Sequence, residues 1–395
     1  MLLACTAFVL AIGSSTSAQA KTVSPQSFGQ HLMYNWDLNP AIPVHAMRLW
    51  DSNTEWCRID KGTSSNQYDF GQLDALFGQA SRLGADVEFT FGKTPQWAAS
   101  GSYPQRSASD QCSGGSTSSA PASESYWNNF VTALVTHSKG KIRAYELWNE
   151  VNDPNYWSGG MNRLVRMSVD AAKIIHRIDP SAAVLSPSVT ATSGGYSYLK
   201  QYLSKLPSGT IDGIAVHSYT NGACPENFVP AEMTSVKASL PSAYANTPIW
   251  STEGGWGQNS ALNPVDCNQK AFVARYDLMM LSQGFVRNYW YAYQNTQWGT
   301  LFDGTGLTPA GVATRTLDDW LSGADFAGCT SDSDGNLWTC DLTTSAGTKA
   351  RVVWATKWAV WYSTSGYSTV KTLDGVSSPA TGWIQAVYEP VLLSS

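Results

Sequence analysis

The chain has 395 residues, of which 43% are hydrophobic and 14% are charged, and its formal net charge is -5. This hydrophobic content is enough for a full core, which excludes an intrinsically disordered chain. The negative net charge offers no basic field of the kind that neutralises phosphate backbones, so we do not expect a nucleic-acid partner.

The first twenty residues predict a secretory signal. An apolar run over residues 2–12 precedes the small-residue motif Ala18-Gln19-Ala20, and cleavage there makes Lys21 the first mature residue. We therefore expect a secreted or periplasmic protein, with lipoprotein anchoring through Cys5 as the minor alternative. No later stretch of the sequence has the ~18 to 20 apolar residues that a membrane span needs.

After this signal, short β-rich runs alternate with amphipathic helical patterns, which is typical of βαβ units. Eight strands are predicted, at residues 28–33, 46–51, 86–91, 142–147, 183–186, 211–217, 248–252 and 286–291. Helices are predicted between them, including residues 73–83, 126–137, 164–178, 198–206 and 269–283. Eight such units in about 300 residues favour a closed (β/α)8 TIM barrel over an open doubly wound sheet. An open sheet would also need a glycine-rich phosphate turn after its first strand, and the sequence has none there.

The pattern changes after Leu321, where residues 336–342, 349–355, 359–363 and 383–391 alternate apolar and polar side chains. These segments predict the strands of a small antiparallel β-domain. We expect a signal peptide at 1–20, a barrel at 21–322 and a small β-sandwich-like domain packed on the barrel at 323–395. The Ser- and Gly-rich stretch 100–125 predicts a long loop after the third barrel strand.

Cysteine content favours disulfides. Of the seven cysteines, six remain once Cys5 is removed, and an even number in an oxidising compartment is typical of disulfide pairing. Order along the chain suggests the following pairs: Cys57 with Cys112, Cys224 with Cys267, and Cys329 with Cys340. This is one of fifteen possible connectivities. A zinc site is the alternative, but no C-x2-C pair or neighbouring histidine supplies its usual spacing, so we expect no metal.

Candidate catalytic residues lie at the ends of predicted strands, where a barrel collects its functional side chains. The fourth strand is followed by Trp148-Asn149-Glu150, and the seventh is followed by Glu253. These strands face each other across the barrel mouth, so the two glutamates can meet over one ligand. Cleavage of a glycosidic bond needs such a pair, because one carboxyl protonates the departing oxygen while the other attacks the anomeric carbon or activates water.

These motifs resemble those of the clan A glycoside hydrolases, and the resemblance spans the predicted barrel. Within the clan, the sequence RLWD at residues 48–51 and VEF at residues 87–89 make the chain most similar to family 39. That family contains β-xylosidases, α-iduronidases and some endo-acting polysaccharide hydrolases. The resemblance implies a retaining enzyme without a cofactor, which cleaves oligo- or polysaccharides, expected to be β-linked, with Glu150 as acid/base and Glu253 as nucleophile.

The resemblance also implies roles for other residues. Asn149 is expected to hydrogen-bond the sugar 2-hydroxyl, and Arg48 to keep Glu253 ionised. His217 and Tyr219, which follow strand six, are expected to line the reacting-sugar subsite, where Tyr219 would orient the nucleophile.

Aromatic residues complete the predicted site. On strand eight, Trp290 or Tyr291 is expected to form a platform beneath the reacting sugar. Trp97, Trp256 and Trp298 are candidates for further sugar subsites, because they lie on predicted mouth loops.

Several alternatives remain open at the level of sequence. Glu88 and Glu146 are expected to be structural carboxylates inside the barrel, and Arg48 could pair with Asp51 instead of acting at the site. A transglycosidase would use the same glutamate pair, and a non-catalytic barrel would bind polysaccharide without turnover. A uronic acid substrate would need cations at the mouth, for which Lys93 and Arg106 are the candidates. The sugar, its linkage, exo or endo action and the oligomeric state stay open.

Overall fold

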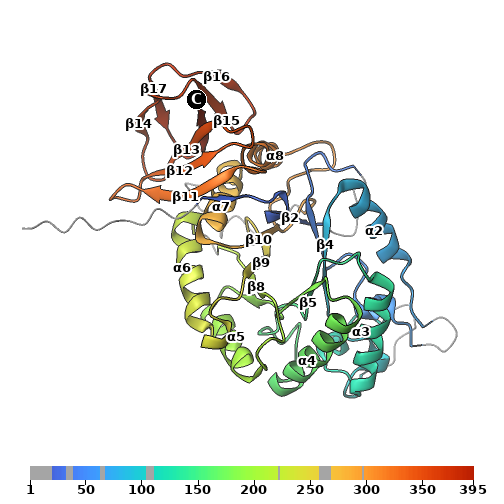
Figure 1. Cartoon of the computed structure of the whole chain (residues 1–395). Helices are drawn as coiled ribbons and strands as arrows, with labels where there is room; N and C mark the ends of the chain where they lie inside the picture. The colour runs from blue at the N-terminus through green and yellow to red at the C-terminus, as the bar shows by residue number, and fades with distance from the viewer. Residues whose placement is uncertain are drawn as a thin grey trace, which may run out of the picture.

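Figure 1 shows the fold in a computed structural model of the chain. The structure describes residues 20–32, 39–62, 67–103, 111–220, 223–257, 268–295 and 298–395. Apart from Ala20, the predicted signal peptide lies outside the described residues. Cys267 and Arg106 lie outside them as well.

A closed barrel of parallel strands forms the centre of the molecule, which confirms the predicted fold class. Its strands are β2 (Phe28–His31), β3 (Ala46–Leu49), β4 (Asp86–Thr90), β5 (Ala144–Glu146), β6 (Ala183–Leu185), β7 (Val189–Thr190), β8 (Ile214–His217), β9 (Ile249–Gly254) and β10 (Arg287–Trp290). In the described chain β6 and β7 share the fifth position, because β6 pairs with β5 and β7 pairs with β8. A parallel bridge between Leu185 and Gly213 and the pairing of β10 with β2 close the barrel.

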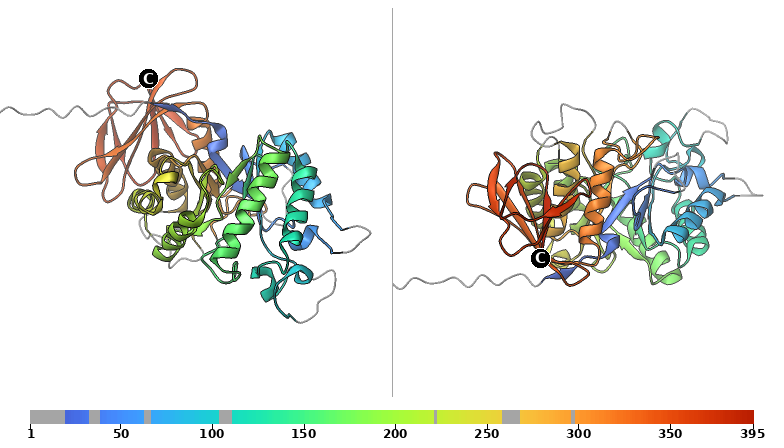
Figure 2. Two further views of the ribbon diagram at one scale, coloured as in Figure 1. Left: turned by 60° about the horizontal axis from the view of Figure 1, so that its bottom comes forward. Right: turned by 90° about the horizontal axis from the view of Figure 1, so that it is seen from above.

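Helices surround the barrel, as Figures 1 and 2 show. They are α1 (Trp56–Ile59), α2 (Gly71–Leu83), α3 (Glu124–Ser138), α4 (Met161–Ile178), α5 (Ser193–Lys205), α6 (Pro225–Ser239), α7 (Gln269–Gln283) and α8 (Pro309–Leu321). Short 3-10 turns lie at Pro25–Ser27, Gln96–Ala98, Gly115–Ser118 and Ser242–Tyr244.

Local sequence sets the helix boundaries. The side chains of Ser123, Thr192 and Asn268 each accept a hydrogen bond from a backbone N–H in the first turn of the helix that follows. α7 ends at Gly284, which has a left-handed φ of 88° that glycine adopts without strain.

Antiparallel strands form the C-terminal region, as predicted. One sheet has the order β1-β11-β12-β13-β18-β15-β16, and β14 pairs with β17 separately. The strands are β1 (Lys21–Thr22), β11 (Asp325–Ser331), β12 (Leu337–Thr343), β13 (Lys349–Ala355), β14 (Val360–Ser363), β15 (Thr369–Thr372), β16 (Ser377–Pro379), β17 (Trp383–Ala386) and β18 (Val391–Ser394). Because β1 pairs with β11, the start of the described chain joins this C-terminal sheet.

One predicted strand in this region is wrong. Residues 383–391 were expected to form a single strand, but β17 and β18 belong to different sheets. Between them lies Pro390, which has no backbone N–H to donate to a strand partner. The chain therefore changes sheets at this proline.

Two of the three predicted disulfides are present. Cys57–Cys112 ties the loop after β4 to α1, which tethers the long loop as predicted, and Cys329–Cys340 links β11 to β12. The pairing of Cys224 with Cys267 stays a prediction, because Cys267 lies outside the described residues.

The C-terminal sheet packs on the barrel through α7. This helix contacts β11 as well as its helical neighbours, and most of its residues are buried. Arg275 on α7 donates two hydrogen bonds of 2.6 Å to Glu226 on α6, and Trp354 on β13 donates a third to the same carboxylate at 2.7 Å. These buried hydrogen bonds thus join α6, α7 and the C-terminal sheet.

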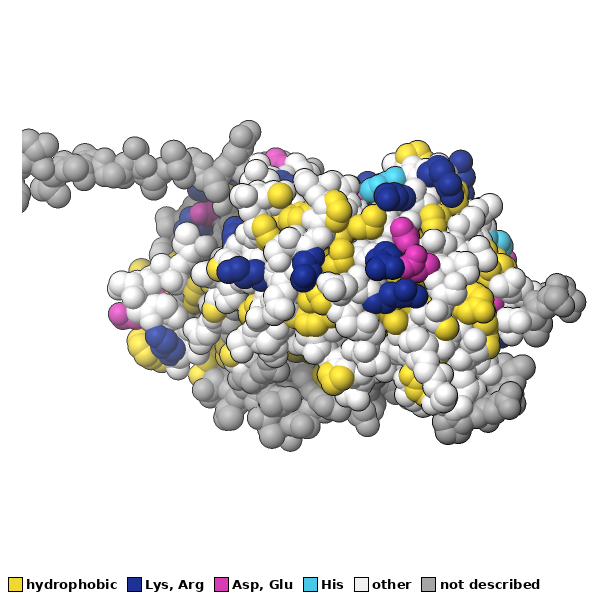
Figure 3. Space-filling view, turned by 90° about the horizontal axis from the view of Figure 1, so that it is seen from below, with side chains coloured by type: hydrophobic (Ala, Val, Ile, Leu, Met, Phe, Trp, Pro, Cys, Tyr) yellow, Lys and Arg dark blue, Asp and Glu magenta, His cyan; other side chains and the backbone are white. Residues whose placement is uncertain are grey.

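The described surface carries few charges, in line with the composition. On the face shown in Figure 3, Lys and Arg side chains lie singly or beside acidic ones, and most of the visible surface is uncharged. None of the helices in the described part of the chain combines the length and the apolar character needed to cross a bilayer.

Candidate active site

A cavity opens where the barrel strands end. Its space, including the open mouth, is about 1000 Å³. The residues that line it follow or end β3, β5, β7, β8, β9 and β10, which is the face where barrel enzymes place their chemistry. They are Trp50, Asp51, Asn149, Glu150, Tyr156, Thr190, Ala191, Thr192, His217, Tyr219, Glu253, Gly257, Tyr291 and Trp298. Both predicted catalytic glutamates therefore border one cavity.

Glu150 lies four residues beyond the end of β5, in an unusual backbone conformation. Its φ is +42°, in the left-handed region that a glutamate rarely adopts. The surrounding structure holds this conformation, because the N–H of Glu150 donates to Ser188 Oγ at 3.0 Å and the next N–H donates to the Ser188 carbonyl. Strained backbone of this kind is frequent at functional sites.

Glu253 lies within β9 and receives hydrogen bonds on both carboxylate oxygens. Tyr219 donates its hydroxyl to Oε1 at 2.7 Å, and Arg48 donates from Nη1 to Oε2 at 2.8 Å. Burial raises the pKa of Glu253, whereas His217, Arg48 and Tyr219 act to lower it. These three groups favour the charged carboxylate and so limit the rise.

His217 links the two glutamates. Its Nδ1 is 2.8 Å from Glu150 Oε1 and 3.7 Å from Glu253 Oε2. Burial alone would lower the pKa of His217, but the charges of Glu253 and Glu150 outweigh it and raise the pKa above its ordinary value. The register of β8 and β9 shifts next to this histidine, and the shift sets His217 opposite Glu253.

The two carboxylates come close to each other. One oxygen of Glu150, one of Glu253 and a ring nitrogen of His217 all lie within 4.8 Å of one another. Three such ligands could in principle hold a metal ion. The guanidinium of Arg48 already contacts Glu253 and His217, however, and its positive charge would repel a divalent cation at this place. The donor set therefore fits proton transfer and nucleophilic chemistry better than metal binding.

Arg48 organises the floor of the site and does not border the cavity. It is fully buried, and Nη2 donates to Asn149 Oδ1 at 2.8 Å and to Glu146 Oε1 at 3.1 Å. Burial disfavours its charge, but Glu146 and Glu253 outweigh this effect and raise the pKa of Arg48. The predicted closeness to Glu253 is thus observed, whereas direct contact with substrate is not available to this side chain.

Glu88 and Glu146 lie behind Arg48 inside the barrel, where the sequence placed them. Burial raises the pKa of Glu88 well above its usual range, and the charge of Glu146 adds to this effect. Burial would also raise the pKa of Glu146, but Arg48 and His217 reverse the shift and lower it. These opposite shifts make Glu146 the more acidic of the two carboxyls, and its oxygen is the closer one to Arg48, at 3.1 Å against 3.7 Å for Glu88.

Asn149 and Tyr219 both border the cavity, as expected from the sequence. The hydrogen bond from Arg48 to Asn149 Oδ1 occupies the amide oxygen, so the amide N–H groups are the side that can face a ligand. Tyr219 is fixed by its bond to Glu253 and by Trp298, whose ring centre is 4.9 Å away.

The predicted aromatic residues fall into two groups. Tyr291 and Trp298 border the cavity, but Trp290, Trp97 and Trp256 do not. Trp290 is buried and donates to the Gly299 carbonyl, so of the two platform candidates only Tyr291 can meet a sugar here.

Trp97 and Trp256 are held by other contacts. The indole N–H of Trp97 donates to the Asp60 carbonyl, and its ring contacts Tyr126. Trp256 packs edge-on against Phe272. Neither side chain is among the described residues that line this cavity, so their role as sugar subsites stays a prediction.

Sequence reasoning did not assign seven of the described lining residues to the site: Trp50, Asp51, Tyr156, Thr190, Ala191, Thr192 and Gly257. Trp50 and Asp51 directly follow β3, so their position at a strand end was a usable signal. Tyr156 and Thr192 lie in loops without a motif, and only the folded chain brings them to the cavity.

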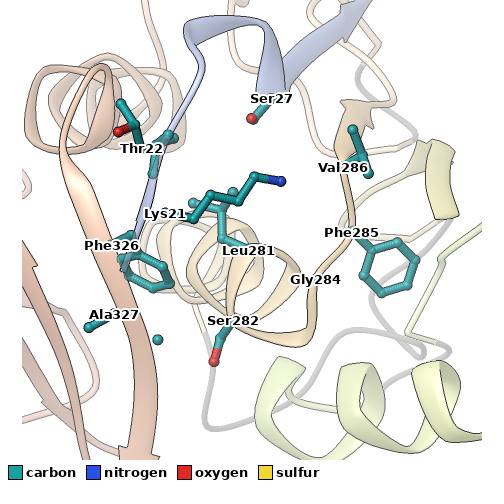
Figure 4. A pocket seen from close by; sticks show the side chains of 12 residues that line it. Lys21, Thr22, Ser27, Leu281, Ser282, Gly284, Phe285, Val286, Phe326 and Ala327 are labelled. Carbon is teal, nitrogen blue, oxygen red and sulfur yellow. The ribbon is translucent and has the colours of Figure 1, made fainter. Parts of the chain in front are cut away.

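A second cavity lies on another part of the molecule, between β1, the end of α7 and β11 (Figure 4). Its space is about 650 Å³, and Lys21 is the one ionisable side chain among its described lining residues. This lining contains no carboxylate. The pair of acids that the sequence predicts is found at the barrel mouth instead.

Comparison with known proteins agrees with this placement. Residues 123–313 match the family model described as glycosyl hydrolase catalytic core. A search of curated proteins found no match to the chain.

Solved structures of several glycoside hydrolases share this fold. A family 39 glycoside hydrolase from Bacteroides cellulosilyticus WH2 superposes with a TM-score of 0.74 at 17% identity, over 94% of this chain and 81% of that one. A family 39 β-xylosidase from Caulobacter crescentus gives 0.67 at 15% identity, over 95% and 97%. A family 44 xyloglucanase from Paenibacillus polymyxa gives 0.59 at 14% identity, over 96% and 98%. The match to a glycosyl hydrolase catalytic core and the barrel shared with these enzymes confirm the predicted resemblance to the clan A glycoside hydrolases.

Proposed function

We propose that the protein is a secreted retaining glycoside hydrolase that cleaves β-linked O-glycosidic bonds in oligo- or polysaccharides by double displacement. The observation that carries this proposal is the approach of Glu150 and Glu253 oxygens to within 4.8 Å. Retaining glycosidases hold their carboxyl groups about 5 to 5.5 Å apart, whereas inverting enzymes leave roughly 6.5 to 9.5 Å for a water molecule. The spacing here favours direct attack by a carboxylate.

In the first step, Glu253 attacks the anomeric carbon of the bound sugar. A bond forms between its carboxylate oxygen and that carbon as the bond to the departing oxygen breaks. Glu150 gives its proton to the departing oxygen, so that a neutral alcohol leaves. The product of this step is a glycosyl ester on Glu253 and a charged Glu150.

In the second step, water replaces the departed group. Glu150, now a carboxylate, takes a proton from this water while the water oxygen bonds to the anomeric carbon. The ester bond to Glu253 breaks, and both glutamates return to their starting protonation states. Two inversions at one carbon leave the anomeric configuration of the sugar unchanged.

The neighbours of each glutamate suit these roles. Arg48 and Tyr219 hold Glu253 by direct hydrogen bonds that favour its charged form, as a nucleophile requires. Once the ester forms, Glu253 is neutral and no longer repels a charge on Glu150, which supports the change of Glu150 from acid to base.

Export is the other part of the proposal. The two disulfides are consistent with an extracellular or periplasmic protein, because such bonds persist in oxidising compartments. The signal predicted at residues 1–20 would direct the chain to export.

Replacement of the nucleophile tests the proposal. We expect Glu253→Ala to lower kcat on aryl β-glycosides by roughly 10⁴-fold or more, because direct attack on carbon is lost. Added azide should restore turnover and give a glycosyl azide of inverted configuration, because a small anion fits the space left by the carboxylate.

Glu389→Ala is the matched control. This partly exposed glutamate pairs with Lys270 in the C-terminal region, and its loss should leave kcat near the wild-type value. Near-normal turnover by Glu253→Ala, or a loss that azide cannot rescue, would argue against Glu253 as the nucleophile.

A further inference from the structure

Asp51 forms part of the cavity wall close to the glutamate pair. Asp51 comes directly after Trp50, the residue that follows β3, and 21% of its side chain is exposed. Its φ is +57°, again in the left-handed region. The fold therefore holds an acidic side chain at the cavity in a conformation that costs energy, as is frequent for functional residues.

Lys93 fixes this carboxylate. Its Nζ is 3.0 Å from Asp51 Oδ1 and 2.7 Å from Glu55 Oε1, and it lies 4.8 Å from the ring centre of Trp50. Lys93 also has a left-handed φ, of +58°. Two carboxylates of the described residues thus share one ammonium group.

The charges around Asp51 favour its charged form. Burial alone would raise the pKa of Asp51, but Lys93 and His31 outweigh burial and lower the pKa. The second oxygen, Oδ2, is 3.5 Å from the hydroxyl of Tyr291, another lining residue. Because Asp51 lines the cavity and 21% of its side chain is exposed, a ligand hydroxyl can reach this carboxylate.

Glu253 is the other carboxylate at the cavity that is charged when substrate binds, because Glu150 then carries the proton that it gives to the departing oxygen. His217 is the only basic side chain among the described lining residues. Arg48 lies behind this surface, and Lys93, a sequence candidate for binding a uronic acid, is already engaged by two carboxylates. A negatively charged sugar would therefore meet repulsion at this wall.

We propose that Asp51 is a specificity-determining residue, whose carboxylate accepts hydrogen bonds from the hydroxyl groups of a neutral sugar and repels the carboxylate of a uronic acid. This inference rests on the proposed function, since it names the class of sugar that the site takes. It assigns the enzyme to neutral glycans such as those built of pentoses or hexoses.

Asparagine is the replacement that isolates the charge. Asn tolerates left-handed backbone at least as well as Asp, so Asp51→Asn keeps both the shape and the fold. Asp374→Asn is the matched control, because Asp374 pairs with Lys270 at 2.6 Å in the C-terminal region and its loss removes the same charge elsewhere.

Ligand affinities measure the selectivity between neutral sugars and uronic acids without turnover. Calorimetry would compare phenyl 1-thio-β-D-glucoside with its glucuronide, the galactoside with its galacturonide, and the xyloside, since thioglycosides resist hydrolysis. For at least one matched pair, we expect wild-type protein to bind the neutral ligand about tenfold or more tightly than the uronide. Asp51→Asn should reduce this ratio about tenfold, by weakening the neutral ligand and strengthening the uronide, and Asp374→Asn should keep the wild-type ratio.

Three results would overturn the inference: equal or tighter uronide binding by wild-type protein, an unchanged ratio in Asp51→Asn, or no binding of any neutral ligand. Failure of the proposed function has a different signature. In that case O-linked glycosides are not hydrolysed through Glu253, while the selectivity in binding is still measured.

Discussion

Two buried arginines organise two different regions of this molecule. Arg48 lies at the barrel mouth and contacts Glu146, Glu253, Asn149 and His217. Arg275 on α7 lies beside α6 and the C-terminal sheet. Glu226 on α6 accepts hydrogen bonds from Arg275 and from Trp354 on β13.

The difference between the two networks lies in their partners. The members of this network named above, Glu226 and Trp354, are buried and do not border the cavity, so these contacts serve packing. Arg48 instead contacts Glu253, Asn149 and His217, which line the cavity, so its network positions groups that can react. A buried ion pair is by itself a weak sign of function, and its connection to a cavity separates the two cases.

After the loss of the nucleophile, the largest expected effect concerns Glu150, which lines the cavity beside His217, a contact of Arg48. Glu150→Ala should lower kcat/KM by roughly 10³ to 10⁴-fold for substrates with poor leaving groups, because these need protonation as they depart. Dinitrophenyl glycosides depart without this help, so their first step should fall by less than about tenfold. Steady-state and single-turnover rates on a series of aryl glycosides measure this. Equal losses across the series would contradict an acid role for Glu150.

The next effect should appear in stability alone. Arg275→Met leaves Glu226 buried without its cation, so we expect the free energy of unfolding to fall by about 3 to 5 kcal/mol. Since Arg275, Glu226 and Trp354 are not among the described residues that line the cavity, kcat/KM of the folded variant should stay within about twofold of wild type. Chemical unfolding followed by fluorescence, together with assays below the transition, checks both. A large drop in kcat/KM at unchanged stability would contradict the claim that the Arg275 network serves packing and not activity.

A smaller effect is expected at Tyr219, where the hydroxyl alone is removed. Tyr219→Phe should lower kcat by about 10 to 100-fold, because Glu253 loses a donor at 2.7 Å that favours its charged form. The pKa of Glu253, already raised by burial, should rise further. The nucleophile acts above its pKa, so the acidic limb of the pH profile should move to higher pH. A limb that stays in place or moves to lower pH would show that Tyr219 does not stabilise this carboxylate.

Part of this picture could be predicted from sequence. The alternation of strand and helix patterns predicted the barrel, because each strand and helix leaves a local periodic signal. Glu150 and Glu253 could be found because strand ends in a barrel converge on one face, and Arg48 could be placed near Glu253 through the family resemblance.

Other features depend on contacts that no local pattern encodes. Trp97 and Trp256 lie in loops near the mouth, yet position in a loop does not determine the direction of a side chain. Arg275 and Glu226 are 49 residues apart on different helices, with no motif around either. Asp51 was visible as a strand-end residue, but its role depends on Lys93, which reaches it from beyond the next strand.

The anomeric configuration of the first product tests the central claim most directly. Proton NMR of an aryl β-glycoside cleaved by the wild-type enzyme follows the new sugar before it equilibrates in solution. The close approach of Glu150 and Glu253 predicts that the β-anomer appears first. First appearance of the α-anomer would mean a single displacement by water and would contradict a covalent intermediate on Glu253.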